Sequence, residues 1–467
     1  MQRVINNNLG MIPLAGICSY EEACALGYDI DRNVNLLKRY IYAVSQLNQV
    51  FAAHIANVPE WEVKCAFSLH IWLEAEHSAA LRKRVMEMRE PPLHLDKVPD
   101  VRLEAFFQEL IRAQSTLELV VGLYRVAKPE LLRAVRKHLC ETNSLVDHPT
   151  CRVLKMIAAE QEEMMAWGES AIQALIQTDE DEARSTEWQK HLESFLQEAG
   201  GISGESKRPE DAPQKTPRSD GSRYVMKLEP SRDDRFIDPY NAAAKIDEYY
   251  VDDSLLADER TYALIYKRLR EMDVPEWMGP IIYQTEGKPW EYYQDLSRQL
   301  WDEARHAMLG EVGLYQDGVE FYKYPIEYRT SMALNCCFKP LEAHVILWYI
   351  EQGLMPRKTG KQLEWAIAKQ SDNELAKTFQ DYDWADEVLH AQIGRRWLVP
   401  EFESLEKLTQ FGESLMERNW AEKAKLDSRS AQSQWWPQFL AEIRESKQRI
   451  RVTQQQKGAV TSDELVK

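Results

Sequence analysis

Two copies of one short motif constrain this chain more than any other feature of its sequence. The motif reads Asp-Glu-x-x-His and occurs at 302–306 and again at 386–390. On a helix, residues three apart lie one turn apart on the same face, so the Glu and His of each copy can bind one ion together. With ten histidines in the chain, Glu three residues before His is expected by chance about once. Two copies, each on a long helical pattern, therefore indicate a metal site.

The alternative is that each motif is an ordinary charge pair on a solvated helix face, which is routine for a single Glu-x-x-His. Two such helices that face each other, each with a neighbouring helix that supplies one more Glu, form a dinuclear metal site in a four-helix bundle. The sequence therefore predicts an all-α fold in which both motifs point inward.

Apolar residues recur at helical spacing along most of the chain, and strand signals are nearly absent. Residues 1–197 are predicted to form an N-terminal bundle, with helices at 32–57, 60–88, 101–126, 130–139 and 149–176. Gly, Pro and charged residues dominate 198–238, which is predicted to be a polar linker.

Residues 239–400 are predicted to form a second bundle, with helices at 242–272, 290–314, 326–354, 361–369 and 373–398. Residues 401–467 are expected to add C-terminal helices, the last ending near 450, and a loose polar tail. Because the two bundles repeat the same order of elements, an internal duplication is one explanation.

Composition limits the partners. The formal net charge of −17 repels phosphate backbones, so nucleic acid is excluded as a partner. The seven cysteines include no Cys-x-x-Cys pair, as expected of reduced thiols in a cytoplasmic protein. No apolar run of membrane-spanning length is present, so no membrane span is expected.

The two missing carboxylates are predicted from their height above the loop that joins neighbouring helices. Glu303 lies about thirteen residues into its helix, and counting back about thirteen from 272 selects Glu259. Glu387 lies about fourteen residues into its helix, and counting back about twelve from 354 selects Glu342. Glu351 is set aside because it lies about 180° around the helix from Glu342.

Six metal ligands are thus predicted: Glu259, Glu303, His306, Glu342, Glu387 and His390. Asp252 shares the face of Glu259 and is its substitute, and exposed helix glutamates are the alternative reading of both lone carboxylates. Oxygen and imidazole ligands without thiolate favour iron or manganese. Glu303 and Glu387 are also expected to be catalytic.

Asp302 is expected to bind the outer nitrogen of His390, and Asp386 that of His306. A carboxylate in that position fixes the imidazole tautomer and makes the ligand more basic. The alternative is that both are ordinary surface aspartates. Four aromatic residues near the predicted ligand level are candidates for a substrate pocket or for plain core packing: Tyr262, Trp301, Trp348 and Trp384.

The ligand order Glu, Glu-x-x-His, Glu, Glu-x-x-His over 240–400 resembles the ferritin-like di-iron carboxylate superfamily. The first motif also has the Asp-Glu-x-Arg-His form that is frequent in the desaturases and oxygenases of that superfamily. The resemblance implies a ferritin-like four-helix bundle with an oxygen-activating centre of two iron ions, and it does not imply a substrate. From the donor set, manganese is the alternative metal. The expected partners are O2 and a small-molecule substrate, with an electron-donor reductase and a homodimer left open.

The expected function is that of a non-haem di-iron oxygenase or oxidase acting on a small or medium organic molecule. A ferroxidase or manganese-catalase-like protein that handles metal or peroxide is the second hypothesis. The third is a non-catalytic helical scaffold whose charge pairs decorate its surface.

The N-terminal bundle departs from the pattern and is expected to be a degenerate ferritin-like copy. It offers an incomplete ligand set: Glu74, His77, Glu118, Glu160 and Glu163, with only Gln46 on the first helix. A buried partial set is costly unless it is paired or neutralised. We therefore expect a metal-free structural bundle, with a weak second metal site as the alternative.

Overall fold

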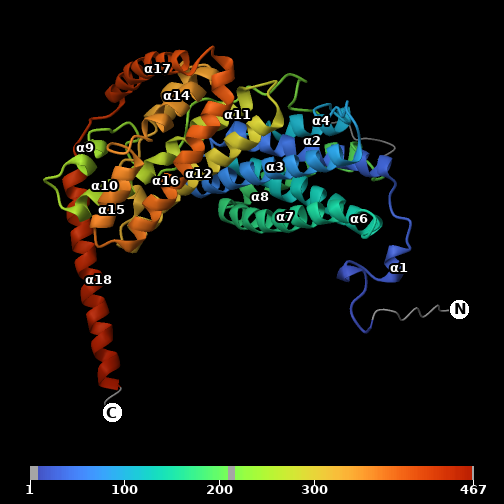
Figure 1. The fold of residues 1–467 in the computed structure, drawn as a ribbon, viewed down its shortest axis with the longest axis horizontal. Helices are drawn as coiled ribbons and strands as arrows, with labels where there is room; N and C mark the ends of the chain where they lie inside the picture. Colours follow the sequence, from blue (N-terminus) through green and yellow to red (C-terminus); the bar gives the residue numbers. More distant parts are fainter. Residues whose placement is uncertain (1–8, 209–215, 465–467) are drawn as a thin grey trace. The chain divides into compact units, whose positions relative to one another are not determined.

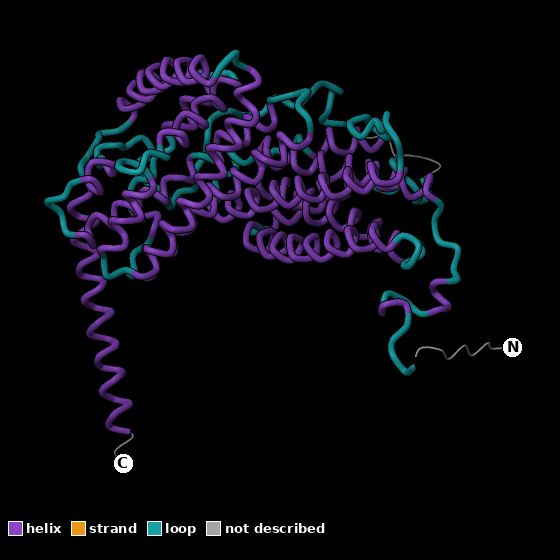
Figure 2. The backbone as a smooth tube through the Cα atoms, viewed as in Figure 1, coloured by secondary structure: helices purple, strands orange, loops and turns teal. Residues whose placement is uncertain are grey.

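The computed structural model describes residues 9–208 and 216–464, with side chains as far as residue 453. Within these ranges all regular structure is helical and no strand is present (Figure 1 and Figure 2). The all-α prediction is therefore confirmed. Among the described residues, no helix combines the length and apolar character that crossing a membrane requires.

The chain forms two compact units. Unit 1 consists of Met1–Val50 and Leu73–Val225, and unit 2 of Phe51–Trp72 and Met226–Lys467. The boundary after residue 225 lies within the predicted linker, of which 209–215 fall outside the described residues. Helices α2 (Ile30–His54) and α3 (Trp61–Met88) each contribute to both units.

The remaining helices of unit 1 are short η1 (Leu14–Gly16), α1 (Tyr20–Ala23), α4 (Val101–Leu110), α5 (Thr116–Val121), η2 (Gly122–Ala127), α6 (Lys128–Glu141), α7 (His148–Leu175) and α8 (Asp179–Glu198). The single helix expected over 101–126 is interrupted at Ser115. The Ser115 hydroxyl accepts a hydrogen bond of 3.2 Å from the Glu118 amide and so caps the start of a new helix, α5. The start of the predicted linker packs into this unit, where Arg39 Nε donates to the Ile202 carbonyl at 2.6 Å.

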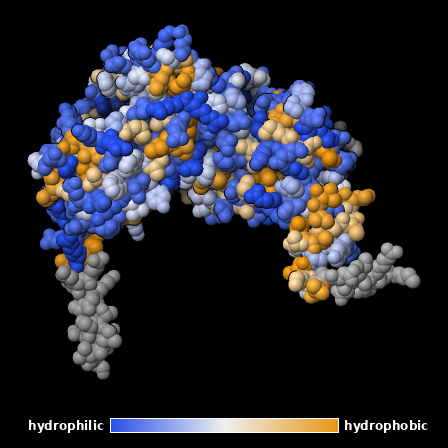
Figure 3. All heavy atoms as spheres, in the orientation of Figure 1, coloured by the Kyte–Doolittle hydropathy of each residue, from blue (hydrophilic) through white to orange (hydrophobic). Residues whose placement is uncertain are grey.

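Apolar side chains are exposed near the N-terminus of unit 1, and Figure 3 shows apolar residues gathered around α1. The exposed residues include Leu9, Met11, Ile12 and Leu26. Polar residues cover most of the rest of the face that Figure 3 shows. The homodimer that the sequence left open stays a prediction.

The helices of unit 2, after the end of α2 and the start of α3, are α9 (Ile246–Val251), α10 (Ala257–Arg270), η3 (Glu271–Asp273), α11 (Pro275–Gln284), α12 (Trp290–Gln316), η4 (Phe321–Lys323), α13 (Arg329–Cys337), α14 (Pro340–Gly353), α15 (Lys361–Gln370), α16 (Glu374–Leu398), η5 (Val399–Glu401), α17 (Leu405–Leu426), η6 (Asp427–Arg429) and α18 (Trp436–Glu464). The helix expected over 326–354 is two helices that meet just before Pro340. The last helix continues well past residue 450.

Glycines bring the helices of unit 2 close together. A Cβ atom at Gly310 of α12 would lie 2.5 Å from the Leu269 amide nitrogen of α10, and one at Gly313 would lie 2.9 Å from Ile265 Cγ2. Because the higher number on α12 faces the lower number on α10, the two helices run in opposite directions. A Cβ at Gly394 of α16 would lie 2.4 Å from the Trp348 side chain of α14. Helix α12 also packs on α16.

Candidate metal centre

Seven acidic and imidazole side chains of unit 2 converge from η3, α12, α14 and α16. They form two groups, and within each group the potential ligand atoms lie within 4.8 Å of one another: Glu303, Glu351, Glu387 and His390 in the first, and Glu271, His306 and Asp383 in the second. All are buried except the half-buried Glu271. Both Asp-Glu-x-x-His motifs thus point inward, as the sequence predicts.

In the first group, His390 Nδ1 lies 3.2 Å from Glu303 Oε1 and 3.3 Å from Glu387 Oε2. Glu351 is held by Gln299, whose Nε2 donates to Glu351 Oε1 at 3.3 Å. Three carboxylates and one imidazole therefore face a common point, a donor set that suits a divalent ion.

In the second group, His306 Nδ1 lies 3.3 Å from Glu271 Oε2 and 3.4 Å from Asp383 Oδ1. The other oxygen of Glu303 lies 4.0 Å from the same nitrogen. The centroids of the His306 and His390 rings are 6.0 Å apart. Glu303 therefore faces both imidazoles and can bridge two ions.

Each of the buried atoms that face the centre lies 3.2–3.3 Å from another of them, but none of them makes a well-aligned hydrogen bond in the protein. They are Glu271 Oε2, Glu303 Oε1, His306 Nδ1, Glu387 Oε2 and His390 Nδ1. Leaving one buried polar atom without a partner costs about 1–3 kcal/mol, and five such atoms in one cluster are exceptional in a folded protein. The residues present therefore fit a pair of metal ions.

On the side of the ring away from the centre, each imidazole contacts the aspartate that the sequence predicts. His306 Nε2 donates to Asp386 Oδ2 at 3.1 Å, and His390 Nε2 lies 3.4 Å from Asp302 Oδ2. With the proton on Nε2, the Nδ1 lone pair of each ring faces the centre. Arg305 donates to both aspartates, at 2.6 Å to Asp386 and 2.7 Å to Asp302.

Replacing Asp386 with asparagine is expected to weaken metal binding about 10–100-fold, because the carboxylate behind His306 then no longer supports its basicity. The measurement is competition for iron against a chelator of known affinity. Asp381→Asn, on the exposed face of the same helix, is the control and should bind metal as the unchanged chain does. Equal affinities of Asp386→Asn and the unchanged chain would contradict the role given to Asp386.

Two predicted ligands are corrected by the structure. Glu259 lies outside the cluster and pairs with Arg444 of α18, beside a surface cavity. Glu342 lies in the first turn of α14, where its carboxylate accepts a hydrogen bond from the Lys339 amide at 2.8 Å. Asp252 accepts one from the Ser254 amide at 2.9 Å and is no ligand either.

Glu271 takes the place of Glu259 because helical structure continues past the predicted end at 272, from α10 through η3 into α11. Pro275 stands in the first turn of α11, where its missing N–H is harmless, and α11 ends at Gln284. Counted from that end, Glu271 lies about thirteen residues back, which matches the height of Glu303 in α12.

Glu351 takes the place of Glu342 because α14 and α16 share no loop: α15 lies between them in the chain and packs on α16 and on α10. The end of α14 therefore meets α16 at the level of Glu387 and not at the start of that helix. Lys361, the first residue of α15, places its Nζ 2.7 Å from Glu387 Oε1. Glu351 lies two residues from the end of α14, whereas Glu387 lies thirteen residues into α16, so matching heights above a shared loop does not apply to this pair.

Three further residues at the centre were missed. Asp383 lies one turn before Glu387 on the same helix face, a spacing that the sequence does display. Lys361 Nζ donates to Asp383 Oδ1 at 2.9 Å, and Arg268 also pairs with Asp383. Both cations are buried, and nothing in the sequence singles them out.

The electrostatics of the centre reflect this crowding of carboxylates. Burial lowers the pKa of His306, but Asp383, Asp386 and Glu271 together raise it to about 10. Burial and the neighbouring Glu387 charge raise the pKa of Glu351 well above its usual range. Bound cations would relieve both shifts, because metal binding replaces protons at such ligands.

Comparison with protein-family models, curated proteins and solved structures found no match. The assignment of a metal centre therefore rests on the geometry of the side chains alone.

A cavity of about 390 Å³ adjoins the centre and includes Glu271, Glu303, Glu351 and Glu387 in its lining. Its aromatic residues are Tyr250 and Trp277. None of the four aromatic residues expected there lines it. Trp348 packs on Gly394, and Trp301 packs against the unit 2 core. The ring centroids of Trp384 and Trp365 are 6.2 Å apart, and the Tyr262 hydroxyl donates a hydrogen bond to Asp317 at 2.6 Å.

In unit 1, a buried lysine pairs with the partial ligand set and forms what we call the lysine-closed cluster. Lys128 Nζ is buried, pairs with Glu74 and lies 3.2 Å from Gln161 Oε1. His77 Nδ1 lies 3.3 Å from Glu74, and its Nε2 lies 2.6 Å from Glu160. An ammonium thus neutralises the cluster, which favours the metal-free reading of this unit.

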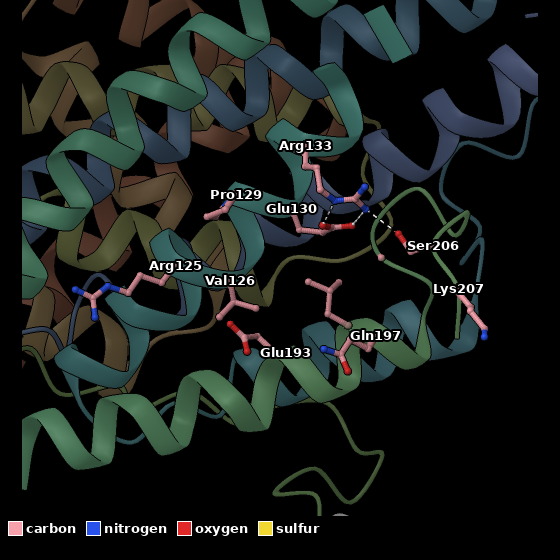
Figure 4. A pocket seen from close by; sticks show the side chains of 11 residues that line it. Arg125, Val126, Pro129, Glu130, Arg133, Glu193, Gln197, Ser206 and Lys207 are labelled. Atoms are coloured by element: carbon pink, nitrogen blue, oxygen red, sulfur yellow. Dashed lines mark hydrogen bonds and ion pairs between the residues drawn. The ribbon is translucent and has the colours of Figure 1, made fainter. Parts of the chain in front are cut away.

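The other residues of the candidate weak site lie elsewhere. Glu118 accepts hydrogen bonds from Arg218 at 2.6 Å and from the Gln114 amide at 2.8 Å, and Glu163 is exposed. Unit 1 also has a surface cavity of about 340 Å³ (Figure 4), where Arg133 donates to Glu130 and to Ser206. None of its lining residues belongs to the lysine-closed cluster.

Proposed function

We propose that this protein is a non-haem di-iron oxidoreductase that uses O2 to oxidise a small or medium organic molecule. The observation that carries the proposal is the set of five buried oxygen and nitrogen atoms that face one another without well-aligned hydrogen bonds. The proposal includes a ferritin-like arrangement of the ligand helices in unit 2 and a degenerate copy in unit 1.

The donor set supports iron, with manganese as the alternative. The centre offers carboxylate oxygens and two imidazole nitrogens, and neither group includes a cysteine. Two iron ions at these positions would supply the activation of O2 and the oxidation of a nearby C–H or N–H group. Repeated turnover then requires an electron donor such as a reductase.

The chain's own residues divide the remaining work. Glu303 would ligate both ions, and Asp302 and Asp386 hold each imidazole with its Nδ1 facing the centre. Lys361 pairs with a carboxylate of each group, Asp383 and Glu387. Arg268, in contrast, pairs with Asp383 and Glu271, both of the second group, and offsets part of their charge. We therefore expect the second position to bind its ion less tightly than the first.

The two other hypotheses fit less well. A scaffold gains nothing from a buried cluster of unpartnered ligand atoms, which costs stability. A ferroxidase or manganese catalase needs only metal, O2 or peroxide at the centre. The adjoining cavity, at about 390 Å³, lies in the size range of sites for organic molecules.

The test is the metal content of the protein purified from iron-supplemented cells, measured for each element, with a visible spectrum after exposure to air. The proposal expects about two iron ions per chain and O2 consumption that depends on an organic substrate. Rapid disproportionation of peroxide without such consumption would favour the catalase hypothesis. A chain without transition metal would leave only the scaffold.

A further inference from the structure

The cavity beside the centre has a second, charged end. The ligand carboxylates lie at one end, and residues of α9, α10, α13 and α17 line the other. The side chain of Asp247 at this end is 63% exposed, so the cavity reaches the surface there. The lining also includes four apolar residues: Val274, Trp277, Ile350 and Leu354.

The carboxylates at the charged end are already engaged. Asp273 accepts hydrogen bonds from the Thr330 amide at 3.2 Å and the Ser331 amide at 3.0 Å. Glu327 accepts from Arg329 at 2.6 Å and from Arg270 at 3.3 Å, and Arg270 also reaches Asp247 at 3.4 Å. This end therefore has little capacity left to bind a cation.

One of its cations has hydrogen-bonding capacity left. Lys423 of α17 is half-buried, donates one hydrogen bond to Thr330 Oγ1 at 3.0 Å, and makes no ion pair in the part of the chain that the structure describes, although, against the effect of burial, its charge lowers the pKa of Glu327. An ammonium has three donors, so two remain. Arg270 Nε is buried without a hydrogen-bond partner. Lys267, in contrast, pairs with Glu364.

We propose that the cavity binds the substrate as a small organic carboxylate, with Lys423 holding the carboxylate group. The apolar residues pack against the carbon chain and direct its far end toward Glu271, Glu303, Glu351 and Glu387. A cavity of about 390 Å³ suits a small ligand of this kind. The inference rests on the proposed function, because it takes those carboxylates as the reacting end.

The test uses sodium hexanoate as the probe, with neutral hexanamide as its isosteric counterpart, and measures binding to the iron-loaded protein by titration calorimetry. Hexanoate is expected to bind at least about tenfold more tightly than hexanamide, a difference of roughly 1.4 kcal/mol. Lys423→Gln should remove this preference. Lys425→Gln is the matched control, because Lys425 lies on the same helix, pairs with Glu422 and does not line the cavity.

Three results would overturn the inference: equal binding of hexanoate and hexanamide, no binding of hexanoate, or a Lys423→Gln chain that keeps its preference. If hexanoate ligated the metals directly, the Lys423→Gln chain would keep its preference for hexanoate over hexanamide, so this result also detects that mode of binding. Metal content, measured on the same samples, separates this inference from the proposed function. A metal-loaded chain without the preference refutes the carboxylate site alone, whereas a chain without metal refutes both.

Discussion

Replacing Glu303 with alanine is expected to remove most of the metal bound to the purified protein. Its carboxylate faces the imidazoles of both His390 and His306, at 3.2 and 4.0 Å, so both positions lose a ligand at once. The loss of metal affinity should exceed the roughly 10–100-fold loss that follows from replacing a residue hydrogen-bonded to a ligand. The measurement is the iron content per chain after dialysis against a weak chelator.

The controls for this experiment come from the two corrected ligands. Glu259→Ala and Glu342→Ala should keep full metal content, whereas Glu271→Ala and Glu351→Ala should lose metal. Removing a carboxylate from a crowded anionic cluster reduces repulsion, so Glu303→Ala should keep its helical circular dichroism. Full metal in Glu303→Ala would refute Glu303 as a ligand, and loss of metal in Glu342→Ala would return Glu342 to the ligand set.

Replacing Lys128 with alanine is expected to lower the free energy of unfolding by about 3–5 kcal/mol, because it leaves Glu74 as a buried charge without its main partner. The side chains of Lys128 and Glu74 are both fully buried. Burial raises the pKa of Glu74, but Lys128 and His77 lower it to about 2. Urea denaturation followed by circular dichroism is the measurement.

A matched double variant separates the loss of an ion pair from the loss of packing. Lys128→Met with Glu74→Leu should recover most of the stability, since replacing both partners of a buried pair is often neutral. Exposed Lys155→Ala should change little. Because the Glu74 pKa is lowered in the folded chain, its contribution is present above about pH 4.3 and is lost toward pH 2. A Lys128→Ala chain as stable as the unchanged one would refute the pairing.

The inward-facing motifs could be predicted because their geometry is local. Glu303 and His306 share a helix face whatever the rest of the chain does, and the same holds for Glu387 and His390. The aspartate before each Glu points to the neighbouring helix for the same reason, and the structure has both cross-helix contacts. The all-α class likewise follows from helical spacing of apolar residues along the chain.

The lone carboxylates could not be predicted, because their height depends on where neighbouring helices begin and end. Proline and glycine near 275–280 predict a break, yet Pro275 begins α11 and Pro280 lies within it. Helix α15 separates α14 from α16 in the chain, and Glu351 at the end of α14 lies at the centre beside Glu387. Neither effect has a signal at the ligand itself.

The sequence by itself determined the helical class, the two Glu-x-x-His turns and the aspartates behind them, since each follows from spacing within one helix. Only the tertiary structure decided that Glu271, Glu351 and Asp383 join them and that Lys361 and Arg268 lie beside them. The physical reason is that a position along one helix is set by rise and rotation per residue. Its alignment with another helix is set by packing and by the connection between them.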